Sequence, residues 1–345
     1  MKYWSLLIIF SLTSLVIHAQ DQVPTEKKQG WTTKLDVGLD LVSNLLINPS
    51  VGGGESRLGA GASLGLNTIY NDGNFSWTNA LNMQFGVQKI GTGYLEDFPD
   101  KKVPFQKNID NIWYNSKIAQ RTSYFSKFYY TTDLFFSSQL TKTYEDNFLS
   151  DVTGRGHPIS QFLSPGIFQA SLGMDYRPND YWSIFLSPAS YKVTIVLDDQ
   201  IADDFATDES GEFLGSIHGN PYEELDNGDI RFENYDNQFG GSLRVSYQNQ
   251  FSNRLSISSN LLLFSNYNRD PDHIDVNWRN MIDVTIFKGL KLSLLSLVNY
   301  DHDIFVEITD YDEIDGVKGF GRRVSYTQQV LLKYSFEFDQ NNKDF

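Results

Sequence analysis

The sequence predicts an all-β fold, a transmembrane antiparallel β-barrel of about twelve strands with short periplasmic turns and longer extracellular loops. Two observations predict this fold class. About twelve runs of alternating apolar and polar residues follow one another along the chain. The connections between these runs are alternately tight and long, and the long ones are mostly acidic or Gly-rich. Bacterial outer-membrane barrels combine an even strand number with this alternation of connections.

The N-terminus predicts export. Lys2 supplies a positive charge, an apolar stretch covers residues 6–17, and Ala19-Gln20 offers a cleavage point, so residues 1–19 have the pattern of a signal peptide. The apolar stretch is shorter than the ~20 residues of a membrane-spanning helix, which argues against a retained anchor. We expect residues 20–30 to form a periplasmic lead, residues 31–339 the outer-membrane barrel, and residues 340–345 a C-terminal tail. The expected location is the outer membrane of a Gram-negative bacterium, after cleavage of a Sec-type signal.

The composition excludes several classes of function. The formal net charge is −15 and the pI is about 4.7. Such an acidic chain is a poor partner for nucleic acid, because neutralising phosphates requires Lys and Arg. The absence of Cys excludes disulfides and thiolate metal sites. The mean hydropathy of −0.35 is compatible with a membrane barrel, since the two faces of an amphipathic strand average out.

Each predicted strand has one apolar and one polar face. In the first strand Leu35, Val37 and Leu39 alternate with Lys34 and Asp36, and alternate side chains of a strand point to opposite faces. In a membrane barrel the apolar face contacts lipid and the polar face lines the lumen. The phase of 109–119 is ambiguous, and 255–264 is partly apolar on both faces. The predicted strands are 34–41, 58–67, 81–88, 109–119, 128–137, 168–177, 182–197, 239–248, 255–264, 274–286, 290–299 and 324–338.

One strand changes phase. Its apolar positions are even-numbered at Trp182 and Ile184 but odd-numbered at Val193 and Ile195. The change falls at Ser187-Pro188-Ala189. Because proline cannot donate a hydrogen bond to a neighbouring strand, the sequence predicts a β-bulge or kink here.

The connections predict an orientation. Aromatic residues gather at the tight turns, where an interfacial belt is expected, whereas a soluble sandwich has no reason to collect them there. With the tight turns in the periplasm, both chain ends lie there too. The tight turns are 70–74, 122–125, 177–180, 250–253 and 287–289. The candidates for the aromatic belt are Tyr70, Phe75, Trp77, Tyr124, Phe125, Tyr176, Tyr181, Trp182, Phe251 and Phe287. The long connections include 91–107, 144–165, 198–237, 301–321 and the shorter 48–56.

Most of the mature chain, roughly from Trp31 to the C-terminus, resembles a known family. The resemblance is carried by Phe162-Leu163-Ser164-Pro165, by the run from Asp175 to Asp180, by Leu186-Ser187-Pro188 and by the run from Lys192 to Asp199. In these segments, and at Asn74 to Asn79, the chain resembles an outer-membrane β-barrel family of Bacteroidota known as a domain of unknown function. Where that family often has Asn-Trp in its first hairpin, this chain has Asn48-Pro49. The resemblance implies a barrel in the outer membrane and no particular activity.

Charged residues on the polar strand faces are the candidate lumen residues. Both signs are present, so opposed charges either close a narrow lumen through ion pairs or create a transverse field that selects polar solutes. About twelve strands give a bore between filled eight-stranded barrels and open porins. The candidates are Lys34, Asp36, Asp40, Asp133, Asp175, Arg177, Lys192, Arg244, Arg279, Asp283, Lys291 and Lys333.

Catalytic and metal sites receive little support from the sequence. In an outer-membrane lipase a histidine base must lie beside a serine, and His302 with Asp301 or Asp303 is the best candidate, with Ser296 or Ser325 as partner. No motif supports this arrangement, and an exposed loop histidine is the favoured interpretation. The run Asp310 to Gly316 departs from calcium-loop spacing, and no helix follows Gly52-Gly53-Gly54 to bind phosphate. We expect no catalytic residue, metal or cofactor.

The leading functional hypothesis is therefore a narrow, porin-like channel or transporter for small polar or amphipathic solutes. The alternative is a non-conducting structural or interaction barrel with acidic outer loops, and a lipid-modifying enzyme ranks third. The expected partners are outer-membrane lipid and glycolipid, with weak divalent bridging at the acidic loops left open. The oligomeric state is left open as well.

Overall fold

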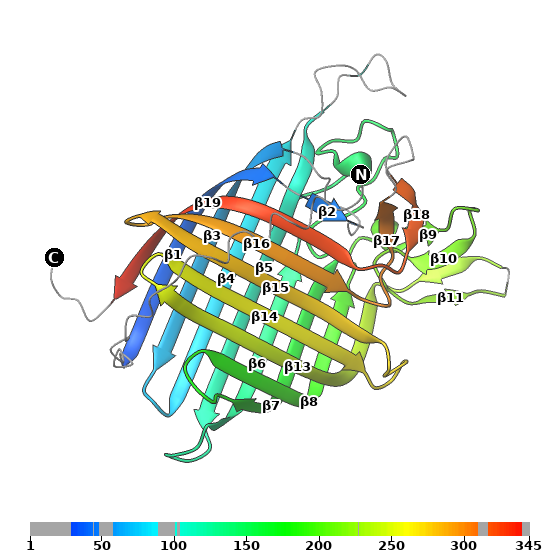
Figure 1. Cartoon of the computed structure of the whole chain (residues 1–345). Coiled ribbons are helices and arrows are strands. Elements are labelled where there is room, and N and C mark those ends of the chain that lie inside the picture. Colours follow the sequence, from blue (N-terminus) through cyan, green and yellow to red (C-terminus); the bar gives the residue numbers. More distant parts are fainter. Residues whose placement is uncertain are drawn as a thin grey trace, which may run out of the picture.

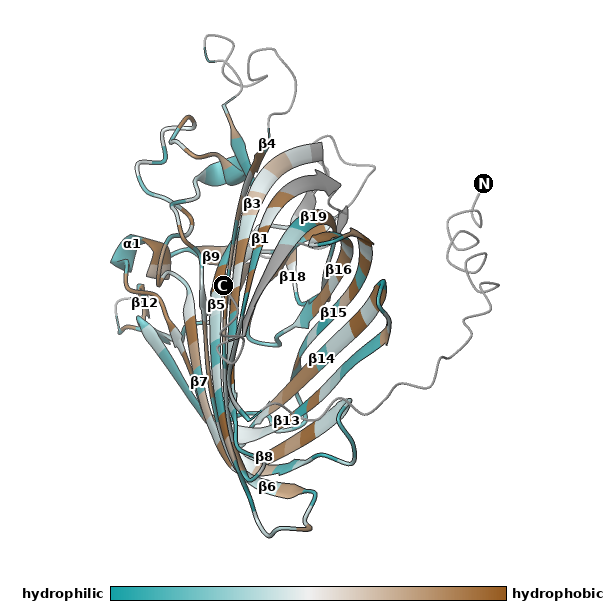
Figure 2. Cartoon of the chain, turned by 90° about the vertical axis from the view of Figure 1, so that its left-hand side faces the viewer, coloured by the Kyte–Doolittle hydropathy of each residue, from teal (hydrophilic) through white to brown (hydrophobic). Residues whose placement is uncertain are grey.

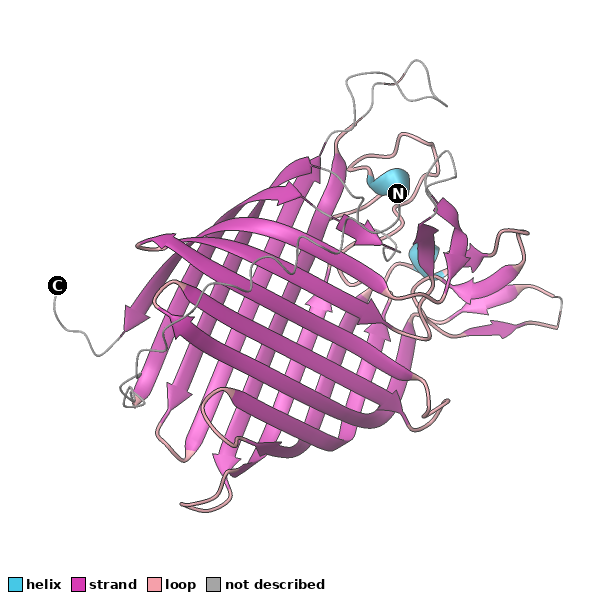
Figure 3. Ribbon diagram, viewed as in Figure 1, coloured by secondary structure: helices cyan, strands magenta, loops and turns pink. Residues whose placement is uncertain are grey.

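The computed structural model describes residues 29–43, 45–47, 58–88, 101, 104–226, 228–309 and 317–339. The predicted signal peptide, most of the predicted lead and the C-terminal tail lie outside these residues. Twelve long antiparallel strands form a closed barrel, because β1 pairs with both β3 and β19 (Figures 1 and 3). These strands are β1 (Gly30–Ser43), β3 (Leu58–Asn71), β4 (Phe75–Gln88), β5 (Gln106–Arg121), β6 (Phe128–Ser138), β7 (Gly166–Tyr176), β8 (Trp182–Ile195), β13 (Tyr235–Ser252), β14 (Leu255–Asn266), β15 (Ile274–Phe287), β16 (Leu290–Tyr300) and β19 (Ser325–Asp339). The predicted fold class is confirmed.

All the tight turns lie at one end of the barrel. They join β3 to β4, β5 to β6, β7 to β8, β13 to β14 and β15 to β16. The first and last strands also begin and finish there, since Thr32 pairs with Asp339. In the β3–β4 turn Asp72 accepts hydrogen bonds from the backbone N–H groups of Asn74 (2.9 Å) and Phe75 (2.7 Å), which lower its pKa and fix the turn. We call this end the turn side and the opposite end the loop side.

The polarity of the barrel is inverted relative to a soluble protein. Apolar side chains on the outside are exposed, such as Leu39 at 73% and Tyr130 at 63%, whereas inward Asp175 and Gln329 are at 0%. Figure 2 shows the resulting alternation of apolar and polar bands along the strands. An apolar outer surface around a polar interior is the pattern of a β-barrel that spans a bilayer. No helix among the described residues is long and apolar enough to cross a membrane.

Aromatic rings gather on the turn side, as predicted. Trp31 packs against Tyr70 and Trp77, with ring centroids 5.4 and 5.7 Å apart. Trp182 packs against Tyr247 at 4.7 Å on the other side of the barrel. Such rings favour the boundary between membrane and water, so the turn side carries one interfacial belt.

The predicted irregularity at Pro188 is a β-bulge. On β7, Leu172 pairs with Ala189 and Met174 with Leu186, so Gly173 alone lies opposite Ser187 and Pro188. The register with β13 shifts at the same place, between Gly240 and Ser242. The bulge removes the need for a backbone donor at Pro188 and changes the face to which every following side chain points.

The loop side carries short elements that pack on one another. They are η1 (Glu145–Asn147), α1 (Asp199–Ala202), β9 (Phe205–Thr207), β10 (Phe213–Ser216), β11 (Tyr222–Glu224), β12 (Ile230–Phe232), β17 (Val306–Thr309) and β18 (Val317–Gly321). Ile159, Ala206, Ile217 and Phe305, from three different connections, form a buried apolar cluster among them. We call the described parts of 139–165, 196–234 and 301–324 the outer-loop cap. A further short strand, β2 (Leu45–Ile47), pairs with β19.

Candidate functional site: the barrel interior

One buried ion pair in the interior joins two strands that are not neighbours in the wall. Arg244 of β13 and Asp133 of β6 approach to 2.9 Å between Nη2 and Oδ2, although two strands separate β13 from β6 in the wall. Both residues are at least nine-tenths buried. Asn115 donates a further hydrogen bond to Asp133 (2.9 Å). In a low-dielectric interior each charge needs this partnership, because an unpaired one is costly to desolvate.

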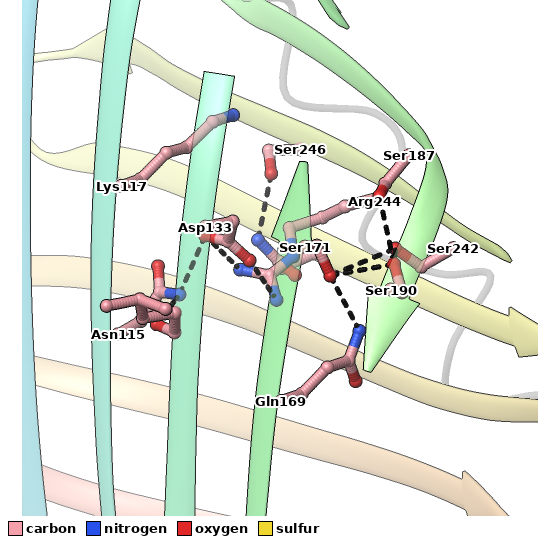
Figure 4. A network of polar contacts seen from close by, with 12 residues as sticks. Asn115, Lys117, Asp133, Gln169, Ser171, Ser187, Ser190, Ser242, Arg244 and Ser246 are labelled. Carbon is pink, nitrogen blue, oxygen red and sulfur yellow. Dashed lines mark hydrogen bonds and ion pairs between the residues drawn. The ribbon is translucent and has the colours of Figure 1, made fainter. Parts of the chain in front are cut away.

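A cluster of four buried serines lies beside this pair (Figure 4). Ser190 contacts the hydroxyls of Ser171 (2.8 Å), Ser187 (2.9 Å) and Ser242 (2.8 Å). Gln169 donates to Ser171 from the loop side (3.2 Å). Ser187 and Ser190 are three residues apart, so a regular strand would point them to opposite faces. The bulge at Pro188 turns both side chains into the lumen. The phase change seen in the sequence therefore brings these serines together.

Two further ion-pair clusters lie in the barrel interior. Asp175 pairs with Arg177 (2.8 Å) and with Lys117 of β5 (2.9 Å) toward the turn side. Lys192 pairs with Asp275 (2.8 Å) and Asp301 (2.7 Å) toward the loop side. Each cluster links strands that are not neighbours in the wall, and therefore narrows the lumen.

The remaining candidates have more varied surroundings. Asp283 pairs with Lys333 (3.1 Å), and Lys34 with Asp36 (3.6 Å). Arg279 stacks on the ring of Trp113, 4.6 Å from its centroid, with no ion pair to a described carboxylate. Lys291, which lies opposite Lys333 in the register, likewise has no ion pair within the described part of the chain. The side chain of Asp40 lies outside the described residues.

Two cavities occupy the interior on either side of the Asp133–Arg244 pair. The turn-side cavity has a volume of about 540 Å³ and reaches from Asn260 and Arg244 to the β7–β8 turn. The loop-side cavity, of about 340 Å³, begins one inward position further along β14, at Leu262. Barrel residues such as Phe135 and cap residues such as Ile217 line it together. The outer-loop cap thus forms part of the wall of the interior.

Sequence reasoning missed several interior residues. Lys117 and Trp113 belong to the strand whose phase was ambiguous, so their inward direction could not be assigned. Leu295 and Leu331 point inward and are almost fully buried, at 1% exposure. They were not predicted as interior residues because we expected only polar residues on the inward face. Asp275 was visible as a polar-face residue, but its pairing with Lys192 depends on strands far apart in the sequence.

The histidine hypothesis finds no serine partner in the structure. The ring of His302 contacts the hydroxyl of Tyr300 (3.0 Å) and stacks on His273, with centroids 3.6 Å apart. Among the described residues no histidine ring hydrogen-bonds to a serine hydroxyl. No group of three or more metal-binding side chains occurs in that part of the chain either. The acidic run Asp310 to Gly316 lies outside the described residues.

Comparison with known proteins gives a family of unknown function and several barrels. A family described as "Protein of unknown function (DUF3078)" matches residues 46–144, less than half of the chain. No curated protein matches the sequence. Similar solved structures include the translocator domain of the autotransporter NalP from Neisseria meningitidis, with 9% identity, 90% of each chain covered and a TM-score of 0.36.

Two other similar structures are described as having activities other than that of the NalP translocator domain. An outer membrane channel from Pseudomonas putida has 9% identity and a TM-score of 0.38, with 92% of this chain and 100% of that chain covered. An active-site mutant of outer membrane phospholipase A from Escherichia coli has 11% identity and a TM-score of 0.34, with 92% and 95% covered. At such low identities and TM-scores no residue or activity is carried over to this chain.

Proposed function

We propose that the protein is a narrow outer-membrane channel or transporter for small polar or amphipathic solutes, exported by cleavage of its N-terminal signal. The observation that carries the proposal is the arrangement of two cavities in line along the interior, separated at one level by the Asp133–Arg244 pair. A filled structural barrel has no need of two such spaces. The family resemblance further suggests a Bacteroidota source.

The chemistry of the two cavities supports an amphipathic solute. Phe135, Leu262 and Phe264 give the loop-side cavity an apolar wall, and Lys192 with its two carboxylates gives it a polar one. The ion pair between the cavities is a polar constriction, which a solute passes only when side chains move. Rings of charged side chains select solutes by sign in other pores, and we assign that role to the inward charges.

The test is the conductance of the purified protein in planar bilayers. We expect small, discrete conductance steps for the unmodified chain and larger steps for the double variant Asp133→Asn with Arg244→Gln. Removing both charges avoids leaving a buried unpaired charge, which would destabilise the barrel. The matched control is Glu223→Gln with Arg231→Gln, which removes a pair whose side chains are 58% and 73% exposed on the β11–β12 hairpin.

The outcomes separate the channel from its alternative. If neither the unmodified protein nor the double variant conducts at any voltage, the channel proposal is abandoned. An equal increase in the control variant would show that the loop-side hairpin, and not the central pair, limits conductance.

The alternative function is that of a non-conducting interaction barrel. The outer-loop cap favours it, because the cap has its own buried clusters and exposes the hairpin residues Glu223 and Glu224. In this second proposal the acidic cap contacts glycolipid, directly or through divalent cations. Binding of vesicles that contain anionic glycolipid, with and without Mg²⁺, measures this contact independently of conductance.

A further inference from the structure

We infer that the turn-side cavity binds a compact anion, namely a solute that bears a phosphate or a carboxylate group. Five cationic side chains from two strands and two turns line this cavity: Lys117 and Arg121 of β5, Arg244 of β13, and Lys127 and Arg177 of the β5–β6 and β7–β8 turns. Its volume of about 540 Å³ lies within the range of small-molecule sites. That this anion is the solute of a channel rests on the proposed function, but its binding can be measured whether or not it passes through the barrel.

The charge of the cavity is opposite to that of the chain. The five cations face three carboxylates, Asp180 in the lining and the buried Asp133 and Asp175 behind it. The excess is positive, whereas the whole chain carries a formal charge of −15. In the loop-side cavity the cations Lys192 and Arg323 are matched by Asp275 and Asp301. The turn-side cavity therefore concentrates anions where the rest of the protein repels them.

Arg244 shows that this cavity holds an unused donor. Its guanidinium pairs with Asp133 through Nη2, but its buried Nε–H has no hydrogen-bond partner. The residue is 7% exposed and lines the cavity. A buried donor without a partner is destabilising, and an oxyanion is the acceptor that a guanidinium N–H binds most strongly. The exposed Lys127 has no side-chain partner in the described part of the chain and supplies a second free cation.

Two other arginines are held in place before any ligand arrives. Arg121 donates from Nε (3.0 Å) and Nη2 (2.7 Å) to the hydroxyl of Tyr129. Arg177 lies over the ring of the same tyrosine, 4.2 Å from its centroid, and donates from Nη1 to Ser76 (3.1 Å). Fixing long side chains in advance lowers the entropy that binding must overcome. Tyr129 thus orients two cations on one wall of the cavity.

The experiment is a calorimetric titration of the full-length protein, purified in detergent, with inorganic phosphate and with succinate, using chloride as the reference anion. We expect saturable binding of at least one oxyanion that chloride does not reproduce. Lys127→Gln and Lys117→Gln should each weaken it about tenfold, since each removes one charged contact. Lys117→Gln leaves Asp175 paired with Arg177, so the barrel should stay folded, and heat-modifiable gel migration checks this.

The matched controls are Arg254→Gln and Lys288→Gln. Both residues are exposed in tight turns at the same end of the barrel, and neither lines the cavity. Their removal changes the net charge by the same amount, so a general electrostatic effect would appear in them equally. They should bind the oxyanion like the unmodified protein.

Each outcome decides the inference. Binding of phosphate alone assigns a phosphate group, and binding of succinate alone a carboxylate. Equal heats with chloride, the absence of saturation, or an equal loss in the control variants would overturn the site. Oxyanion binding without conductance would contradict the channel proposal and support the anion site. Conductance without oxyanion binding would support the channel proposal and contradict the anion site.

Discussion

At the scale of single residues, buried polar groups in this barrel are stable because they share partners. Asp175 is fully buried, yet it accepts from Lys117, Arg177 and the hydroxyl of Ser183 (2.6 Å). A buried carboxylate with several donors recovers much of its lost hydration, and it becomes costly only when it is left without a charged partner. The lumen is therefore a connected polar structure, in which a buried charge stays stable as long as one of its charged partners remains.

His218 of the outer-loop cap is buried without a charged partner. Its ring nitrogen Nε2 lies 3.1 Å from the carbonyl oxygen of Ile159, to which the neutral ring donates. Burial lowers the pKa of His218 to about 4, and the hydrogen bond opposes this only in part. The folded cap thus holds a neutral histidine that the opened cap would protonate near its ordinary pKa of about 6.5.

This difference predicts a cap that opens in acid. Because the opened form binds a proton below pH 6.5 and the folded form only below about 4, cap stability falls as the pH falls through this window. The full loss is about 3 kcal/mol. Hydrogen exchange of residues 196–234, corrected for the intrinsic pH dependence, should show opening that increases about tenfold per pH unit.

The variant His218→Gln isolates the effect. Its amide can still donate to the carbonyl of Ile159 but does not titrate, so the pH dependence over the same window should flatten. Asp204, whose pKa burial raises, contributes with the opposite sign in both proteins. Identical pH profiles for the two proteins would assign the opening to another group.

The alternation of the sequence identified most inward charges but not which of them pair with one another. Asp133 and Arg244 are 111 residues apart, and only the closed wall brings them together. The inward Leu295 and Leu331 escaped prediction for a physical reason. The lumen is narrow enough at their level for packed side chains to exclude water, so the polar-inside rule of wide barrels does not apply.

At the scale of elements, the bulge in β8 and the glycine beside it form one unit. A Cβ atom on Gly173 would lie 2.1 Å from the carbonyl oxygen of Leu186 and 2.7 Å from the Cα of Ser187. Ser187 and Pro188, the two bulge residues that lie opposite Gly173, crowd the facing strand at this point. Gly173 is therefore required by the close approach of two backbones.

Substitution at this position should destabilise the barrel. We expect Gly173→Ala to lower the free energy of unfolding by about 1–3 kcal/mol, the usual cost of forcing a methyl group into a packed site. The change is read as the temperature at which the folded band disappears on gels. Gly65→Ala is the control, because its nearest contact would be an ordinary 3.5 Å. Equal losses in both variants would refute a special role for the bulge.

Strands could be predicted from the sequence, whereas the small elements of the cap could not. Most barrel strands have a period of two over eight or more residues, and the phase change at Pro188 is itself visible in the sequence. The hairpins β9–β10 and β11–β12 are short, and their segment is dominated by acidic residues. Long-range packing of Ala206, Ile217 and Phe305 stabilises part of this region. Such contacts cannot be predicted from a local alternation of apolar and polar residues.

At the scale of the whole molecule, the two ends of the closed barrel differ, so one observation is enough to decide its orientation in the membrane. All five tight turns and both ends of the described chain lie on the turn side, while the cap and the long connections lie on the loop side. Outer-membrane barrels place short turns in the periplasm and long loops outside. In the orientation that we propose for this chain, the turn-side cavity opens toward the periplasm and the acidic cap faces the exterior.

Surface labelling of cells tests this orientation. A short epitope inserted at Gly211, at the exposed tip of the β9–β10 hairpin, should bind antibody on intact cells, whereas one inserted at Gly73 in the β3–β4 turn should bind only after the outer membrane is permeabilised. Both glycines have a positive φ and open space around them, so both insertions should leave the barrel folded. Labelling at Gly73 on intact cells would invert the barrel and place the basic cavity at the exterior mouth, where it would meet anions of the medium and not those of the periplasm.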